Sequence, residues 1–76
     1  MYLSCGHYRG RIQTKTARIF ESLADAWTWA MQQDKGWASR PLARIWLVSS
    51  SGEPILLKPL DIQTSLGLPL KVKDWA

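Results

Sequence analysis

Cys5 and His7 are the side chains best suited to covalent chemistry, because they are the only thiol and the only imidazole of the chain. They lie two residues apart, so a β-strand would project both from one face. A cysteine nucleophile also needs a group that orients the histidine and a pocket that excludes water, and the sequence indicates neither. A structural zinc ion would need two further ligands. We therefore expect neither Cys–His catalysis nor a metal site.

The six carboxylates are scattered along the chain, with no pair at a spacing suited to general acid–base catalysis. A glycine-rich loop that could cradle a phosphate is also absent from the sequence. We therefore expect a protein that is not an enzyme and that uses no cofactor.

Basic residues near the N-terminus form a stronger chemical signal. Arg9, Arg11 and Gln13 alternate with small or apolar residues, so we expect them on one strand face, with Lys15 and Arg18 nearby. Arginine and glutamine make bidentate contacts with guanine and adenine, and a two-stranded ribbon fits the major groove of DNA. An acidic protein surface would suit the same residues, and an ordinary solvated sheet face would also carry them.

The formal net charge of +4 is distributed unevenly along the chain. Residues 1–20 hold four basic side chains and no acid, whereas residues 21–34 hold three acids and no base. A one-sided positive field favours polyanions or an acidic protein surface. The sequence therefore predicts that nucleic acid or an acidic partner binds Arg9, Arg11, Gln13, Lys15, Arg18, Arg40 and Arg44.

Five tryptophans exceed what the core of a 76-residue chain can hide, so we expect at least one at the surface. Trp29 lies about 240° around the expected helix from Leu23, away from its apolar stripe. We predict that Trp29, Trp37 and Trp75 anchor a protein partner. A homodimer that uses an exposed edge strand and Trp46 is a further alternative.

Length and composition predict a single domain over residues 1–76. The lone Cys5 excludes an internal disulfide and suits a reducing compartment. The longest apolar runs stay well below the roughly 18 residues of a membrane span, and the N-terminus lacks the apolar stretch of a signal peptide. We therefore expect a cytoplasmic protein without a membrane partner.

The clearest predicted element is a helix that begins after Ser22 and ends at residues 34–36. Its apolar stripe consists of Leu23, Ala26, Trp27, Ala30 and Met31. Before it, we expect a strand over residues 2–13, a turn at residues 14–16 and a second strand over residues 17–20.

After the helix, we expect strands at residues 43–48 and 55–58, joined by a turn at residues 49–53. Gly67 indicates irregular structure between Pro59 and Pro69, and residues 70–72 are a candidate fifth edge strand guarded by lysines. The predicted fold is therefore α+β, in the order β-β-α-β-β. One helix packs on one face of an antiparallel sheet of four or five strands.

Residues 8–30 combine an aromatic residue, alternating basic and aliphatic residues, a strand that ends in phenylalanine, and a capped helix. The positions that carry this pattern are Tyr8, Arg9, Arg11, Ile12, Phe20, Ser22, Ala26, Trp29 and Ala30. In this stretch the chain resembles the arm-type DNA-binding module of phage tyrosine integrases. The resemblance implies that the sheet enters the major groove, where Arg9, Arg11 and Gln13 would contact bases or phosphates.

Two functions fit these features. The first is a small phage or mobile-element protein that docks on nucleic acid or a nucleoprotein complex through a basic strand face. The second is an inhibitor or adaptor that binds a host defence or nuclease complex, in the manner of an anti-CRISPR protein, through exposed tryptophans flanked by arginines.

Overall fold

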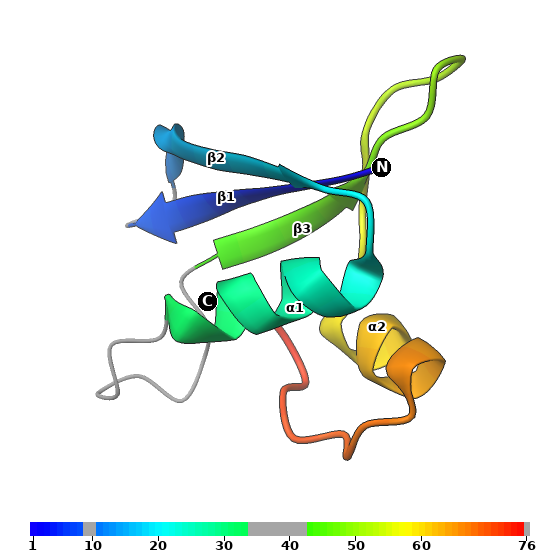
Figure 1. Ribbon diagram of the computed structural model, residues 1–76. Coiled ribbons are helices and arrows are strands. Elements are labelled where there is room, and N and C mark those ends of the chain that lie inside the picture. Colours follow the sequence, from blue (N-terminus) through cyan, green and yellow to red (C-terminus); the bar gives the residue numbers. More distant parts are fainter. Residues whose placement is uncertain (9–10, 34–42, 76) are drawn as a thin grey trace.

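The computed structural model describes residues 1–8, 11–33 and 43–75, in the order β-β-α-β-β-α (Figure 1). The strands are β1 (Tyr2–Tyr8), β2 (Arg11–Phe20), β3 (Ala43–Leu47) and β4 (Ile55–Leu56). The helices are α1 (Leu23–Gln32) and α2 (Pro59–Leu66). The strands form one antiparallel sheet in the order β2-β1-β3-β4. The predicted α+β class and four-stranded antiparallel sheet are confirmed.

Helix α1 forms where its cap and apolar stripe predicted it. The hydroxyl of Ser22 accepts a hydrogen bond from the backbone N–H of Asp25 at 3.4 Å, which satisfies a donor of the first turn. The predicted stripe faces the core, with its central members buried and the outer two partly buried: Ala26, Trp27 and Ala30, flanked by Leu23 and Met31. The expected end at residues 34–36 lies outside the described residues.

The first two strands differ from the prediction. β1 ends at Tyr8 and β2 begins at Arg11, so residues 14–16, which were expected to form a turn, lie inside β2. The predicted turn was wrong because Thr14 and Thr16 are β-branched residues that suit a strand, and no glycine or asparagine among them favours a tight turn.

Residues 14–17 nevertheless mark an irregularity of the sheet. Ser4 pairs with residue 18 and Gly6 with residue 13, so Cys5 alone lies opposite the four residues 14–17. The hydroxyl of Thr16 accepts a hydrogen bond from the backbone N–H of Gly6 at 2.7 Å. A side chain thus replaces a missing backbone partner, and β2 bulges away from β1 at this point.

Helix α2 replaces the irregular stretch that the sequence indicated after Pro59. Proline at the first position needs no hydrogen-bond partner, and Gly67 ends the helix in the left-handed conformation with φ 71°. The backbone N–H groups of Gly67 and Leu68 donate to the carbonyls of Thr64 and Gln63 at 3.2 and 2.9 Å. Gly67 therefore terminates a helix, and its interpretation as a helix breaker was wrong.

The C-terminal segment, residues 68–75, forms neither helix nor strand, so the predicted fifth strand at residues 70–72 is wrong. The side-chain amide of Gln63 binds its backbone instead. Oε1 of Gln63 accepts from the N–H groups of Lys71 and Val72 at 3.1 and 3.0 Å, and Nε2 donates to the carbonyl of Val72 at 2.6 Å. Gln63 is buried, and its hydrogen bonds hold the segment in place without the backbone hydrogen bonds of a β-strand.

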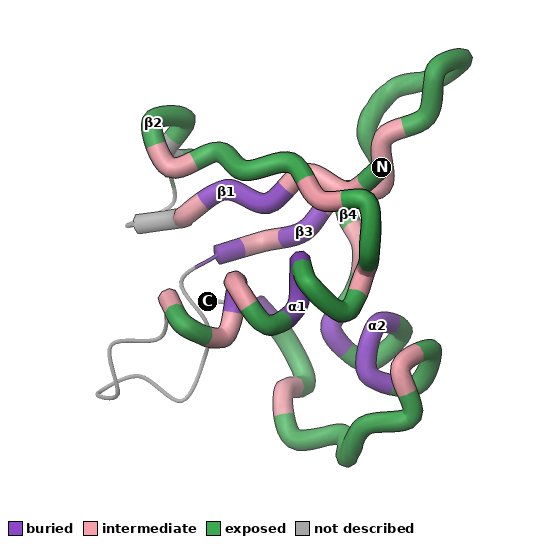
Figure 2. The backbone as a smooth tube through the Cα atoms, viewed as in Figure 1, coloured by how far each residue is buried: buried purple, intermediate pink, exposed green. Residues whose placement is uncertain are grey.

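Both helices lie on the same side of the sheet, where the buried residues concentrate (Figures 1 and 2). The core cluster joins residues of α1, β3, α2 and the C-terminal segment: Ala26, Trp27, Ala30, Ala43, Ile45, Ile62 and Trp75. In the described part of the chain, neither helix has the length and apolarity needed to cross a membrane. The opposite side of the sheet has no helix over it, and we call it the helix-free face.

Candidate binding surface

The structure describes the side chains of only four of the predicted binding residues: Arg11, Lys15, Arg18 and Arg44. Arg9 and Arg40 lie outside the described residues, as does the side chain of Gln13. Arg11 begins β2, whereas β1 ends at Tyr8, so the single strand that the sequence predicts over residues 2–13 is wrong.

Arg18 and Arg44 project from opposite faces of the sheet. Arg18 pairs with Ser4 and Arg44 pairs with Cys5, and neighbouring residues of a strand point to opposite sides. A guanidinium N–H of Arg18 donates to the carbonyl of Ala17 at 2.9 Å, so this side chain lies along its own strand. The expectation of one contiguous cationic surface is therefore wrong for these two residues, while Arg11, Lys15 and Arg18 remain exposed along β2.

The tryptophans expected to anchor a partner are placed differently. Trp75 is only 6% exposed, its indole N–H donates to the carbonyl of Leu57 at 2.8 Å, and its ring lies 6.1 Å from that of Trp27. Its assignment to a partner surface is wrong, because the C-terminal segment carries it into the core. Trp29 is half-buried, with its ring 6.1 Å from that of Phe20, and Trp37 lies outside the described residues.

An apolar row crosses the helix-free face. Direct cross-strand pairs link Ile19 to Leu3, Leu3 to Trp46, and Trp46 to Leu56. Residues that pair directly share a face of the sheet, so this row runs through all four strands in the order β2-β1-β3-β4. Ile45, the neighbour of Trp46 in β3, is fully buried with the core cluster on the helix side.

The ends of this row are open to solvent. Ile19 is 64% exposed and Leu56 is 42% exposed, while Leu3 and Trp46 are half-buried. Beside the row is a shallow depression of about 160 Å³, and its lining is Leu3, Cys5, Ile12, Trp46 and Pro54. Ile12 is itself 50% exposed. A contiguous apolar surface of this kind, exposed on a folded chain, is typical of a site for another macromolecule.

Arg44 adds a positive charge to the helix-free face. It precedes Trp46 by two residues on β3, a central strand, so both side chains leave the sheet on this face. Tryptophan and arginine are the residue types that most often dominate the energy of protein–protein interfaces. The face thus combines an apolar row with a central cation.

Cys5 lies at the floor of the depression but is not suited to nucleophilic catalysis. The thiol is buried, and burial raises its pKa, so that it stays protonated at neutral pH. The described residues contain no cluster of three or more His, Cys, Asp or Glu side chains that could hold a metal ion. Cys5 therefore offers no reactive thiolate at the helix-free face.

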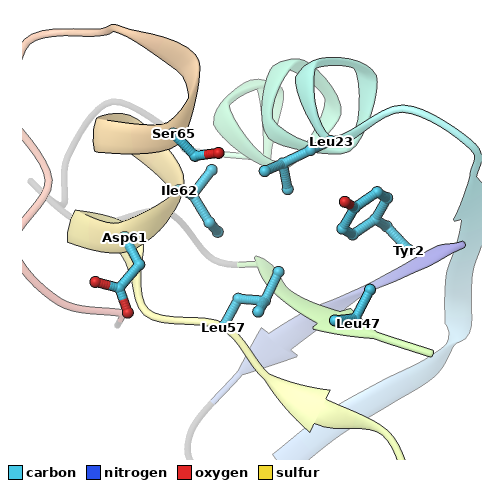
Figure 3. A pocket seen from close by; sticks show the side chains of 7 residues that line it. All are labelled: Tyr2, Leu23, Leu47, Leu57, Asp61, Ile62 and Ser65. Atoms are coloured by element: carbon cyan, nitrogen blue, oxygen red, sulfur yellow. The ribbon is translucent and has the colours of Figure 1, made fainter. Parts of the chain in front are cut away.

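A second hollow lies on the helix side, between α1, α2 and the ends of β1 and β3 (Figure 3). Its volume of about 210 Å³ is below the roughly 300 Å³ of typical small-ligand pockets. The hydroxyls of Tyr2 and Ser65 face an otherwise apolar lining, while the carboxylate of Asp61 points away from the hollow (Figure 3). This arrangement is typical of a packing gap between elements.

The sequence pattern did not lead to the apolar row, although β3 carries a signal for it. The sequence predicts a buried strand over residues 43–48, but in β3 the buried Ala43 and Ile45 alternate with the half-buried Arg44 and Trp46. That alternation is typical of a sheet with one covered face and one open face. Ile19 and Leu56 could not be found in the same way, because their partners depend on the register.

A comparison of the chain with protein-family models, with curated proteins and with solved structures finds no match.

Proposed function

We propose that this protein is a non-catalytic binding module that docks the helix-free face of its sheet on a partner protein. The observation that carries the proposal is the apolar row from Ile19 through Leu3 and Trp46 to Leu56. Folding alone does not account for this row, because both helices cover the other side of the sheet.

The energetics support a contact surface. Burying an exposed isoleucine or leucine side chain contributes about 1.5–3 kcal/mol, so covering Ile19, Ile12 and Leu56 would supply a substantial part of a binding free energy. Trp46 offers a large, rigid aromatic surface. Its side chain is already partly buried, so immobilising it in an interface costs little conformational entropy. The protein would act as an inhibitor or adaptor, and the lone thiol of Cys5 suits a reducing, cytoplasmic location.

A matched pair of isoleucines tests this proposal. Ile19 and Ile55 are 64% and 61% exposed, but Ile55 pairs with Leu47 on the helix side of the sheet. We expect Ile19→Asp to abolish capture of partner proteins from a nuclease-treated lysate of the source cells. Ile55→Asp should leave the same proteins bound, because it adds the same charge on the other face.

The measurement is quantitative mass spectrometry of proteins retained by the wild type and by each variant. Circular dichroism confirms that both variants are folded. Equal retention by Ile19→Asp and the wild type would show that the helix-free face is not the interface.

Binding to nucleic acid is a second candidate, favoured by the charges of β2. This edge strand exposes Arg11, Lys15 and Arg18 and contains no acidic residue. The resemblance of residues 8–30 to the DNA-binding module of phage integrases supports the same function and a phage or mobile-element origin. If these three cations bind phosphates, the affinity for duplex DNA should fall with salt with a log–log slope of about −3. An affinity independent of salt would remove this candidate.

A further inference from the structure

We infer that the occupant of the helix-free face is an acidic protein surface, with a carboxylate that meets Arg44 and apolar side chains that cover the row around Trp46. This inference rests on the proposed function, since it names the partner of the same face. It follows from the charges of the sheet, from the shape of its edges and from what a second copy of the chain would bring.

The sheet carries charge of one sign. The strand residues include four basic side chains and no acidic one: Arg11, Lys15, Arg18 and Arg44. The acids of the described chain lie instead at the connections, in the helices and in the C-terminal segment: Glu21, Asp25, Glu53, Asp61 and Asp74. Arg18 points to the helix side, so the positive charge at the centre of the helix-free face comes from Arg44. Because no residue of the four strands is acidic, electrostatic complementarity favours an acidic partner on this face.

The edges of the sheet favour docking on the face over addition of a strand. β4 has only two residues, Ile55 and Leu56, so it offers a short ladder to an incoming strand. β2 is longer, but its pairing is broken at residues 14–17, where Lys15 is exposed. Short strands, bulges and lysines are the features that block pairing at sheet edges. The apolar row on the face has no such protection.

A second copy of the chain fits the face less well than an acidic partner. A symmetric dimer through this face would bring two copies of Arg44 toward each other from central strands. It would also bring together two chains that each carry a net charge of +4. Like charges at close range oppose association, and burial in an interface reduces their screening by salt.

The test uses the full chain and a peptide library of random sequence displayed on phage. Peptides are selected on the immobilised wild-type protein, and the enriched sequences are synthesised for titration. We expect enrichment of aspartate and glutamate beside apolar residues. Ile19→Asp should weaken binding of these peptides at least about 30-fold, as expected for an apolar hot spot. Arg44→Glu should weaken it about tenfold or more.

Lys58→Glu is the matched control for Arg44→Glu, because it makes the same change of charge at an exposed residue before α2. It should weaken binding less than about threefold, as expected for a charge outside the contact. Arg44→Gln, which removes the charge at similar size, replaces Arg44→Glu if circular dichroism shows that the latter is unfolded. Equal effects of the Arg44 and Lys58 variants would overturn the contact with Arg44.

The remaining outcomes separate this inference from the proposed function. Selected peptides that depend on Ile19 but lack acids would overturn the acidic partner and leave the docking face standing. Peptides that bind equally to wild type and Ile19→Asp would overturn both. A dimer in light scattering that Ile19→Asp dissociates would identify a second copy as the occupant. Binding of single-stranded oligothymidine that requires Ile19 and Arg44 would identify nucleic acid.

Discussion

The two faces of the sheet are built from the same four strands, and both carry apolar side chains. On the helix-covered face, Ala43 and Ile45 of β3 are fully buried under α1. On the helix-free face, Ile19 and Leu56 lie open to solvent at the two edges of the sheet. The covered face therefore stabilises the fold, whereas Ile19 and Leu56 of the open face contribute little to folding and are available for binding.

Ile45→Ala and Ile19→Ala should give the largest difference in stability between the two faces. Both substitutions delete the same atoms, but only Ile45 is buried. At Ile45, the deletion leaves a cavity in the core and should lower the free energy of unfolding by about 3 kcal/mol. At Ile19, the change should stay within about 0.5 kcal/mol. Urea denaturation followed by circular dichroism measures both. Similar losses at the two positions would mean that the open face also stabilises the fold.

Gln63→Met tests what stabilises the covered side, where the side chain of Gln63 binds the backbone of the C-terminal segment. The substitution keeps the length of the side chain but removes the acceptor of the Val72 N–H and one of the two acceptors of the Lys71 N–H, which also donates to the carbonyl of Pro69 at 2.9 Å. We expect a loss of about 2 kcal/mol in the free energy of unfolding. Hydrogen exchange should show faster exchange at these two amides.

Gln32→Met is the control for this substitution, because Gln32 is an exposed residue of α1. Its free energy of unfolding should match that of the wild type within about 0.5 kcal/mol. Unchanged exchange at Lys71 and Val72 in Gln63→Met would contradict the role of Gln63 as the anchor of the segment.

Cys5 gives the smallest expected effect, on the pH dependence of stability. Burial raises the pKa of its thiol in the folded state, so the unfolded chain loses this proton first as the pH rises. The folded state then binds more protons, and the free energy of unfolding should fall above about pH 8.5, until the pH passes the folded pKa. Below that range, the thiol is protonated in both states and contributes no slope.

Cys5→Ala should lack this contribution, so its stability should fall less steeply than that of the wild type between neutral and alkaline pH. Lysine and tyrosine side chains titrate in both proteins, so their effects cancel in the difference between the two urea midpoints at each pH. That difference measures the contribution of the Cys5 thiol to stability. Parallel curves would show that the thiol is as accessible to water in the folded state as in the unfolded one.

The elements that the sequence predicted best are those with strong local signals. The cap at Ser22 and the apolar stripe of α1 depend on spacing within one helix, and both are confirmed. Helix α2 is not among the predicted elements, because Gly67 indicates an interruption when it is considered alone. Together, proline at the start and glycine after the end are typical boundaries of a short helix.

The candidate surface was harder to predict because it depends on register. Tyr8 and Arg11 are three residues apart in the sequence, yet they pair across two strands, so the first strand ends earlier than the sequence predicts. The sequence identifies the basic residues, but it does not show from which face of the sheet each side chain projects. A shift of one residue in the pairing reverses the side to which every side chain of a strand points.

By itself the sequence determined the class of fold, the position of α1 and the excess of positive charge, since composition and short-range periodicity suffice for these. Only the tertiary structure decided that Trp75 enters the core and that Ile19, Leu3, Trp46 and Leu56 form one row. The physical reason is that burial and cross-strand pairing join residues distant in the chain. Their energies depend on how the helices and strands pack, which local propensity does not specify.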